Sequence, residues 1–280
     1  MTNLTRIAVP NKGRLAVPSQ DLLRAAGLVF ESSSRALTVT AHNMPIEVLF
    51  VRADDIPELV HDGVAQYGIT GLDLVTEAGL DNVVVQDLGF GRCTLTAAVD
   101  AASPVQSLDD FSGLRVATSH PKTVEQFFGD KEIEVTTVPL KGSVEVAPKL
   151  DIADAIVDLV SSGSTMLTNG LRPVATVIDS QAVLIGGTDD SGSPLRTMIR
   201  SVVAATRKRY VLMNVHRTVV AEVERIIPGA DSPTLVPLAQ DDMFAMHSVV
   251  DADEMWRVLP ALEMAGASAI LVLPIEQMLP

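Results

Sequence analysis

The residues with the most evident chemical potential form one run, 154–165, in which two acids precede small hydroxyl residues around a glycine. The acids are Asp154 and Asp158, and the small residues are Ser161, Ser162, Gly163, Ser164 and Thr165. Where a strand turns into a helix, backbone N–H groups point outward and the positive end of the helix dipole adds to them. Such a turn can hold a phosphate, and the hydroxyls add donors. The run therefore predicts a phosphate loop.

The two acids need separate roles. Residues four apart in a strand are about 13 Å apart, so Asp154 and Asp158 cannot grip one sugar together. If Asp158 lies at the turn, it faces a ribose hydroxyl while Asp154 supports it from within the lobe. The alternative is that Asp154 is a solvated edge residue and that residues 161–165 are an ordinary helix cap.

Further charged residues stand at the ends of other apolar runs. Lys12 lies beside Gly13 and Arg14 after the first run, Arg52 follows a second, and Asp73 enters a glycine turn after a third. Cations at the carboxyl end of a strand suit a nucleotide triphosphate. The alternatives are a solvent-facing loop for Lys12, a surface cation for Arg52 and a first-turn helix acid for Asp73.

Composition narrows the class of ligand. The 280 residues are 47% hydrophobic and 20% charged, which is enough apolar material for packed cores. The net charge of −14 opposes binding to a nucleic-acid backbone, so we expect no nucleic-acid partner. The sequence also shows no metal-ligand spacing of Cys or His, no Walker lysine motif and no dinucleotide G-x-G-x-x-G. A small phosphorylated ligand remains the expectation.

The single cysteine, Cys93, cannot form an internal disulfide, and we interpret it as a small packed residue rather than a catalytic thiol. The start of the chain has no apolar stretch of signal length, and no run approaches the roughly 20 residues that span a bilayer. We expect a cytoplasmic protein without a membrane partner.

The elements that must position these residues alternate in type up to about residue 208, because short Val- and Ile-rich runs separate helical patterns. The expected strands are 4–9, 46–51, 67–70, 83–87, 94–99, 114–118, 132–138, 153–160, 174–178 and 182–185. The expected helices are 18–26, 54–61, 121–128, 144–150 and 194–208. This order is typical of βαβ units, so we predict two α/β lobes joined by crossing strands, with the ligand site in the cleft between them.

The last segment has a different order of elements. Strands are expected at 210–215, 234–238, 244–250 and 268–275, and helices at 219–227 and 253–265. This βαββαβ order predicts a ferredoxin-like domain. Pro260 lies inside the second expected helix, where an interior proline costs about 3 kcal/mol, so we expect a kink or a restart there.

Five segments taken together resemble the ATP phosphoribosyltransferase family, which catalyses the first step of histidine biosynthesis. They are 9–13, 68–74, 89–91, 142–145 and 153–165, and their order and spacing match from end to end. The resemblance implies a periplasmic-binding-protein-like body with lobe I at 1–92 and 184–208 and lobe II at 93–183. It also implies an ACT-like regulatory domain at 209–280.

By the same resemblance the chain binds ATP and phosphoribosyl pyrophosphate, needs Mg²⁺, forms a homohexamer from dimers and is inhibited by histidine. Asp154 and Asp158 match the catalytic acids, and 161–165 match the phosphate loop. The resemblance places Lys12, Arg52 and Asp73 on the nucleotide side of the cleft. The implied histidine pocket comprises Asn214, Ser232, Thr234 and Ala269.

Two positions depart from the family pattern: Glu125 and Ser164 stand where related sequences often have Arg. A carboxylate near pyrophosphate is repulsive, so either that contact is not essential or Glu125 points away. A rival interpretation is a non-catalytic two-lobed solute-binding protein with an amino-acid-sensing domain. The absence of an export signal and the acidic phosphate-loop motif count against it.

Overall fold

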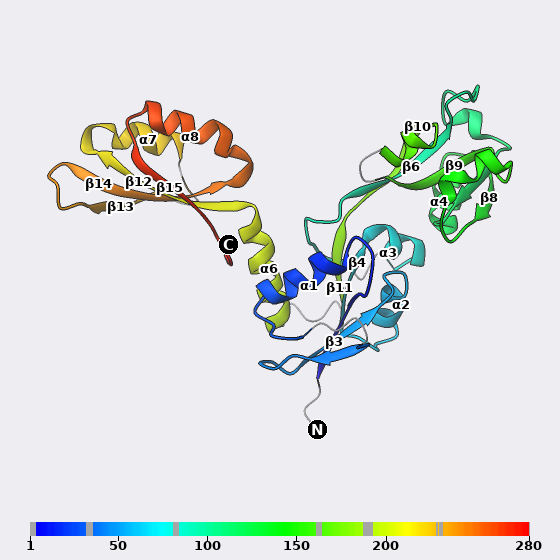
Figure 1. Cartoon of the computed structure of the whole chain (residues 1–280), viewed down its shortest axis with the longest axis horizontal. Coiled ribbons are helices and arrows are strands. Elements are labelled where there is room, and N and C mark those ends of the chain that lie inside the picture. Colours follow the sequence, from blue (N-terminus) through cyan, green and yellow to red (C-terminus); the bar gives the residue numbers. More distant parts are fainter. Residues whose placement is uncertain are drawn as a thin grey trace. The chain divides into compact units, whose positions relative to one another are not determined.

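The computed structural model describes residues 4–31, 36–80, 84–160, 164–186, 193–227, 229 and 232–279. Within it the chain forms two compact units. The first comprises Met1–Arg24 with Leu28–Ser191, and the second comprises Ala25–Gly27 with Gly192–Pro280. Figure 1 shows the elements along the chain. No helix in the described ranges combines the length and apolarity that crossing a membrane requires.

The first sheet of the N-terminal unit has the order β2-β3-β1-β4-β11-β5. Its strands are β1 (Thr5–Pro10), β2 (Thr38–Thr40), β3 (Ile46–Val51), β4 (Tyr67–Gly71), β5 (Val84–Asp87) and β11 (Ala182–Gly186). The central strands β3, β1 and β4 are parallel, and the others pair antiparallel. Its helices are α1 (Ala16–Ala25), α2 (Ile56–His61) and α3 (Leu72–Ala78). This sheet forms the first lobe.

The second sheet has the order β10-β6-β9-β7-β8 and forms the second lobe. Its strands are β6 (Cys93–Asp100), β7 (Arg115–Thr118), β8 (Thr136–Pro139), β9 (Ala155–Val160) and β10 (Leu171–Ser180). Its helices are α4 (Pro121–Gly129), α5 (Ser164–Thr168) and the short 3₁₀ turns η2 (Asp109–Phe111), η3 (Val144–Val146) and η4 (Pro148–Leu150). Side chains of β9 alternate between two cores, one under α4 and one under η3.

The chain crosses between the two sheets twice. It passes from β5 to β6 through residues 88–92, and it returns from β10 to β11 through Gln181 alone. Figure 1 shows these crossing strands between the lobes. The predicted two-lobed α/β body is confirmed. The ligand site is expected where the chain crosses between the lobes.

The C-terminal unit contains α6 (Pro194–Thr206), which leads into the antiparallel sheet β13-β14-β12-β15. The strands are β12 (Lys208–His216), β13 (Thr234–Pro237), β14 (Met243–Asp251) and β15 (Ser268–Pro274). Short turns η5 (Arg217–Val219) and η6 (Ala252–Glu254) lead into α7 (Val220–Ile226) and α8 (Met255–Met264). Alternate residues of β12 and β14 pack on these helices, because successive side chains of a strand point to opposite faces and the helices cover only one face of the sheet. The predicted βαββαβ order is confirmed.

Three local predictions differ from the structure. Residues 144–150 form η3 and η4 rather than one helix, because Pro148 has no N–H and Ser143 and Asp151 adopt positive φ on either side. The strand expected from 132 begins only at Thr136, after Glu132 with φ of 57°. Pro260 lies inside α8, which continues through it without a restart.

Candidate active site

Three predicted ligand residues follow neighbouring parallel strands of the first sheet. Lys12 comes after β1, Arg52 after β3, and Asp73 after β4. The register pairs Pro10 with Val51, so the strands end level with one another. The structure therefore brings Lys12, Arg52 and Asp73 to one edge of the sheet, where open α/β sheets bind ligands.

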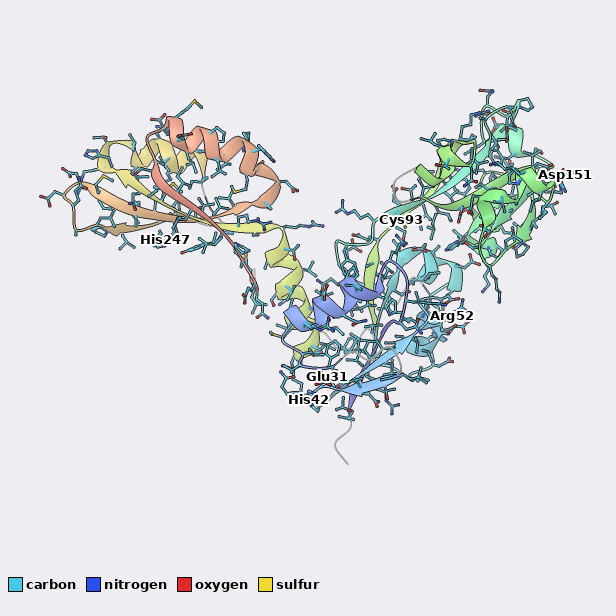
Figure 2. The ribbon with its side chains drawn as sticks, in the orientation of Figure 1. Glu31, His42, Arg52, Cys93, Asp151 and His247 are labelled. Carbon is cyan, nitrogen blue, oxygen red and sulfur yellow. The ribbon has the colours of Figure 1, made fainter. Side chains whose placement is uncertain are left out.

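The two cations at this edge differ in their surroundings. Lys12 is exposed. Arg52 is also exposed, and its Nε and Nη2 donate to both carboxylate oxygens of Asp54 at 3.0 and 2.8 Å. The hydrogen bond from Arg52 holds the pKa of Asp54 below its ordinary value. Arg52, which Figure 2 labels, thus already has Asp54 as an anionic neighbour.

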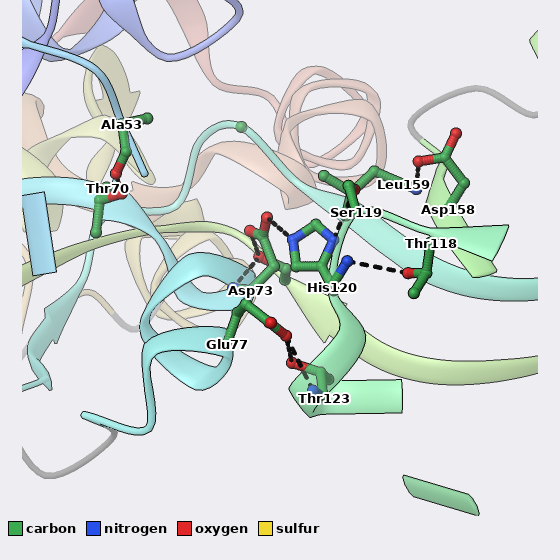
Figure 3. Close-up of polar contacts among 12 residues, drawn as sticks. Ala53, Thr70, Asp73, Glu77, Thr118, Ser119, His120, Thr123, Asp158 and Leu159 are labelled. Carbon is green, nitrogen blue, oxygen red and sulfur yellow. Dashed lines mark hydrogen bonds and ion pairs between the residues drawn. The ribbon is translucent and has the colours of Figure 1, made fainter. Parts of the chain in front are cut away.

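Asp73 is buried where residues of the two lobes meet, with a side chain only 2% exposed. Ser180 Oγ donates to Asp73 Oδ1 at 2.5 Å, and His120 Nε2 lies 3.3 Å from Oδ2 (Figure 3). Arg14 Nη2 lies 3.8 Å from Oδ1. Burial alone raises the pKa of Asp73, but the hydrogen bonds with His120 and Ser180 and the nearby positive charge outweigh it, so the pKa is lowered. Asp73 is an ionised anchor between the lobes.

Arg14 is the cation of the first loop that reaches the crossing strands. Its Nη1 donates to the Gly91 carbonyl at 2.7 Å. Gly91 has a φ of 63°, in the left-handed region that favours glycine, and a Cβ there would lie 2.2 Å from Leu15 Cδ2, so a larger residue would also have to displace the Leu15 side chain. Lys12 was chosen as a site residue from the sequence, whereas Arg14 makes the contacts with Gly91 and Asp73. The sequence showed two cations beside Gly13, but it could not show which of them reaches the crossing strands.

A cavity of about 460 Å³ lies where the strands cross. Its lining comes from the start of α3, both crossing segments and the last residue of β9: Leu72, Arg92, Cys93, Thr94, Val160, Asp179, Ser180 and Gln181. Figure 2 labels Cys93, whose thiol has its pKa raised by burial. Val160, one of these lining residues, immediately precedes the predicted phosphate loop in the sequence.

Asp158 lies near the carboxyl end of β9, on the sheet face covered by η3. Burial raises the pKa of Asp158, and the negative charge of Glu145 on η3 raises it further. Its Oδ1 accepts the Leu159 N–H at 2.9 Å. Glu145 was part of a resembling segment but was not chosen as a site residue, because sequence spacing alone does not show that η3 faces Asp158.

Asp154 lies at the opposite, amino end of β9. Its carboxylate accepts from Arg115 Nε and Nη2 at 3.1 and 2.9 Å and from the Arg115 N–H at 2.8 Å. The hydrogen bond from the Arg115 side chain lowers the pKa of Asp154. The structure therefore does not bring Asp154 and Asp158 together, and Asp154 ties β9 to β7.

The core of the predicted phosphate loop, Ser161, Ser162 and Gly163, lies outside the described residues. Ser164 and Thr165 begin α5. The departure at Glu125 has a local explanation: Thr137 Oγ1 on β8 donates to Glu125 Oε1 at 2.7 Å. The carboxylate is therefore held toward β8.

The four residues expected to bind histidine do not gather in one C-terminal unit. Asn214 pairs with Ser268, next to Ala269, on the β12–β15 side of the sheet. Thr234 lies on β13 at the other edge and pairs with His247, and Ser232 precedes it. Three strand spacings, about 14 Å, separate the two edges.

Among the described residues no group of three or more His, Cys, Asp or Glu side chains is placed to hold a metal ion. The described residues instead place the cations Lys12, Arg14 and Arg52 after β1 and β3 of the first sheet. In the second lobe, the partly buried Asp158 lies near Glu145.

Comparison with known proteins identifies relatives of this chain. The family model for ATP phosphoribosyltransferase matches residues 52–207, and the model for its C-terminal domain, HisG_C, matches 205–277. The chain is 40% identical to an ATP phosphoribosyltransferase of Methanococcoides burtonii, over 99% of this chain and 100% of that one. It is 41% identical to one of Maricaulis maris over the full length of both.

A solved structure shares the fold of part of the chain. The ATP phosphoribosyl transferase (HisG:HisZ) complex from Thermotoga maritima contains a chain that is 24% identical, with a TM-score of 0.60. The match covers 70% of this chain and 99% of that one. That match shows the shared fold. The family models and the full-length relatives establish that this chain belongs to the ATP phosphoribosyltransferase family.

Proposed function

We propose that this chain transfers the 5-phosphoribosyl group of phosphoribosyl pyrophosphate to N1 of ATP and releases pyrophosphate, as the first step of histidine biosynthesis. The observation that supports this most directly is the cavity of about 460 Å³ with Val160, the last residue before the phosphate loop, in its wall. That volume lies within the range of small-ligand sites, roughly 300 to 1,000 Å³.

The proposed reaction needs no side-chain nucleophile. N1 of the adenine attacks C1 of the ribose, the bond from C1 to the pyrophosphate oxygen breaks with inversion, and the electron pair leaves with pyrophosphate. The transition state is oxocarbenium-like, so the protein must stabilise positive charge on the sugar. Asp158 is the acid nearest the loop in the sequence, and we assign it to the ribose hydroxyls.

The remaining roles follow the two sides of the cleft. Residues 161–165 hold the 5-phosphate through backbone N–H groups and hydroxyls. Lys12 and Arg52 counter the charge of the ATP phosphates. Arg14 and Asp73 hold the first loop and the start of α3 in place through their contacts with Gly91, Ser180 and each other. Asp154 stabilises the second lobe by joining β9 to β7, because its carboxylate already accepts hydrogen bonds from Arg115.

We also propose that the reaction requires Mg²⁺. Mg²⁺ keeps several waters and is commonly held by substrate phosphates with few protein ligands, which suits the lack of a three-ligand group among the described residues. Bound in that way, Mg²⁺ would neutralise the negative charge of the pyrophosphate. The site residues above act on the sugar and on the adenine nucleotide.

The experiment is a pyrophosphate-release assay. The full chain should release pyrophosphate only when both ATP and phosphoribosyl pyrophosphate are present with Mg²⁺, and omission of either substrate should abolish the signal. The solute-binding alternative, which family membership does not favour, predicts ligand binding without pyrophosphate. That result from a well-folded sample would refute the proposal.

Regulation and assembly complete the proposal. We propose inhibition by histidine at the C-terminal unit and a homohexamer built from dimers. Removal of 210–280 should abolish inhibition while leaving pyrophosphate release measurable. If the truncated chain is insoluble, Thr234→Ala in the full chain should raise the histidine concentration for half inhibition. Unchanged inhibition in a soluble truncation would place the effector site elsewhere.

A further inference from the structure

The first turn of α4 in the second lobe takes its hydrogen-bond acceptor from the first lobe. The N-cap residue, His120, makes no side-chain capping bond. Instead Glu77 of α3 accepts from the N–H groups of Lys122 and Thr123 at 3.1 and 2.9 Å, and from Thr123 Oγ1 at 2.8 Å (Figure 3). A carboxylate here satisfies N–H groups that have no partner within the helix and interacts favourably with the helix dipole. The helix of one lobe is thus completed by the other.

A second bridge lies beside the first. His120 Nε2 lies 3.3 Å from Asp73 Oδ2 across the cleft, while Nδ1 lies 2.9 Å from Ser119 Oγ in its own lobe. The side chains of His120 and Asp73 are 3% and 2% exposed. Because Asp73 and Glu77 are four residues apart on α3, they share one helix face. That face therefore presents two carboxylates to the start of α4.

Both bridges lie close to the point where the chain crosses between lobes. The N–H of Leu72 donates to the Gln181 carbonyl at 2.9 Å, and the N–H of Asp73 donates to Ser180 Oγ at 3.0 Å. These bonds fix the start of α3 to the crossing segment. Rotation of the second lobe about Gln181 would carry α4 away from α3 and break both bridges together.

We propose that Glu77 and His120 are positioning residues that form a latch between the lobes and hold the cleft in the arrangement that binds both substrates. Neither needs to touch a substrate. A ligand that binds only the latched arrangement has an apparent dissociation constant equal to its intrinsic one divided by the latched fraction. Loss of the latch therefore weakens the binding of each substrate to the free protein by the same factor. The rate of the chemical step in the complex with both substrates is retained.

The first test is Glu77→Ala in the full chain. The KM for ATP and the KM for phosphoribosyl pyrophosphate, each measured with the other substrate held far below saturation, should both rise about tenfold, with kcat at saturation of both changed by less than about twofold. Hydrogen exchange at the amides of Lys122 and Thr123 should accelerate. Glu77→Gln should fall between, because its amide oxygen keeps one acceptor.

A matched control lies inside the second lobe. Asp110 accepts from the N–H groups of Gln106 and Ser107 at 2.8 and 2.9 Å and from Ser107 Oγ at 3.1 Å, the same donor set that Glu77 binds across the cleft. Asp110→Ala should leave both KM values unchanged. The comparison separates loss of a bridge between lobes from loss of a capped turn.

His120 provides a second test that does not depend on Glu77. In His120→Asn the amide replaces Nδ1 and keeps Ser119 as a neighbour, whereas in His120→Gln it replaces Nε2 and keeps Asp73. The latch predicts that His120→Gln retains both KM values near wild type and that His120→Asn raises both. The proposal is overturned if Glu77→Ala and Asp110→Ala change the KM values equally, or if only one of the two KM values rises. It is also overturned if Glu77→Ala accelerates hydrogen exchange at Lys122 and Thr123 but leaves both KM values unchanged.

Discussion

At the scale of single residues, the acids of the site have opposite electrostatic settings. Asp73 is buried but ionised, because His120, Ser180 and Arg14 surround it. Asp158 is buried near Glu145 and has a raised pKa. The sequence identified Asp158 as an acid of the run that precedes the predicted phosphate loop, and Asp73 from its position after an apolar run. It could not show their different environments, because the partners come from segments far apart in the chain.

The raised pKa of Asp158 predicts opposite effects of Asp158→Asn on activity and on stability. Turnover should fall about 10- to 100-fold, since a neutral amide stabilises the positive sugar less well. A raised folded-state pKa means that ionisation destabilises the fold as pH rises above the ordinary value of 3.8. Asp158→Asn should therefore raise the Tm at pH 7, and the gain should disappear below pH 3.8.

Calorimetry across this pH range and steady-state kinetics measure the two effects. Glu145→Gln offers a comparison, since it removes the neighbouring charge and should lower the pKa of Asp158. A lower Tm for Asp158→Asn at pH 7, or unchanged turnover, would contradict the assignment.

The lowered pKa of Asp73 gives the reverse stability profile. Its ionised form stabilises the fold above the ordinary value of 3.8, and this stabilisation is lost as pH falls through the lower folded-state value. Asp73→Asn should cost about 2 kcal/mol of unfolding free energy at pH 7, because it removes a charged acceptor from a buried pair. Urea denaturation at pH 7 and at pH 3 should show a smaller difference at the lower pH. Equal losses at both would contradict it.

At the scale of elements, the spacing of apolar residues predicted nearly every strand and helix of the described chain. Each element has to bury one face in a hydrophobic core, and this sets the spacing of its apolar residues. The exceptions have local causes. Strand β2 has only three residues, too few to show a period, and Pro148 splits the expected helix at 144–150 into two turns. The pairing of Glu77 with α4 was also beyond the sequence, since it depends on which helices face each other across the lobes.

Helix α8 provides a prediction at this scale. Pro260 lies within it and is exposed, and a proline nitrogen cannot donate to the carbonyl of Trp256 one turn earlier. Pro260→Ala should stabilise the C-terminal unit by about 1 kcal/mol, with the regained hydrogen bond partly offset by greater freedom of the unfolded chain. Chemical denaturation followed by far-UV circular dichroism measures the change in unfolding free energy. A lower unfolding free energy in Pro260→Ala would show that the proline stabilises this unit.

At the scale of the whole molecule, the body and the C-terminal unit carry different parts of the predicted function. The resemblance placed four histidine-binding residues in the C-terminal unit, but strand order separates them. Asn214 and Ala269 lie toward the β15 edge, whereas Ser232 and Thr234 lie at or beside β13. Strand order is set by non-local pairing, so the sequence pattern could not show this separation.

The separation leads to a prediction about assembly. A histidine is shorter than the roughly 14 Å between the two sheet edges, so it cannot contact Thr234 and Ala269 of one C-terminal unit at once. If both sets bind it, two copies of the chain must share each histidine, and ligand binding and association are then linked by mass action. Sedimentation velocity should show histidine shifting the chain toward larger assemblies, and the apparent histidine affinity should rise with protein concentration. Thr234→Ala should weaken both effects, whereas binding of one histidine per monomer at a concentration-independent affinity would show that a single copy suffices.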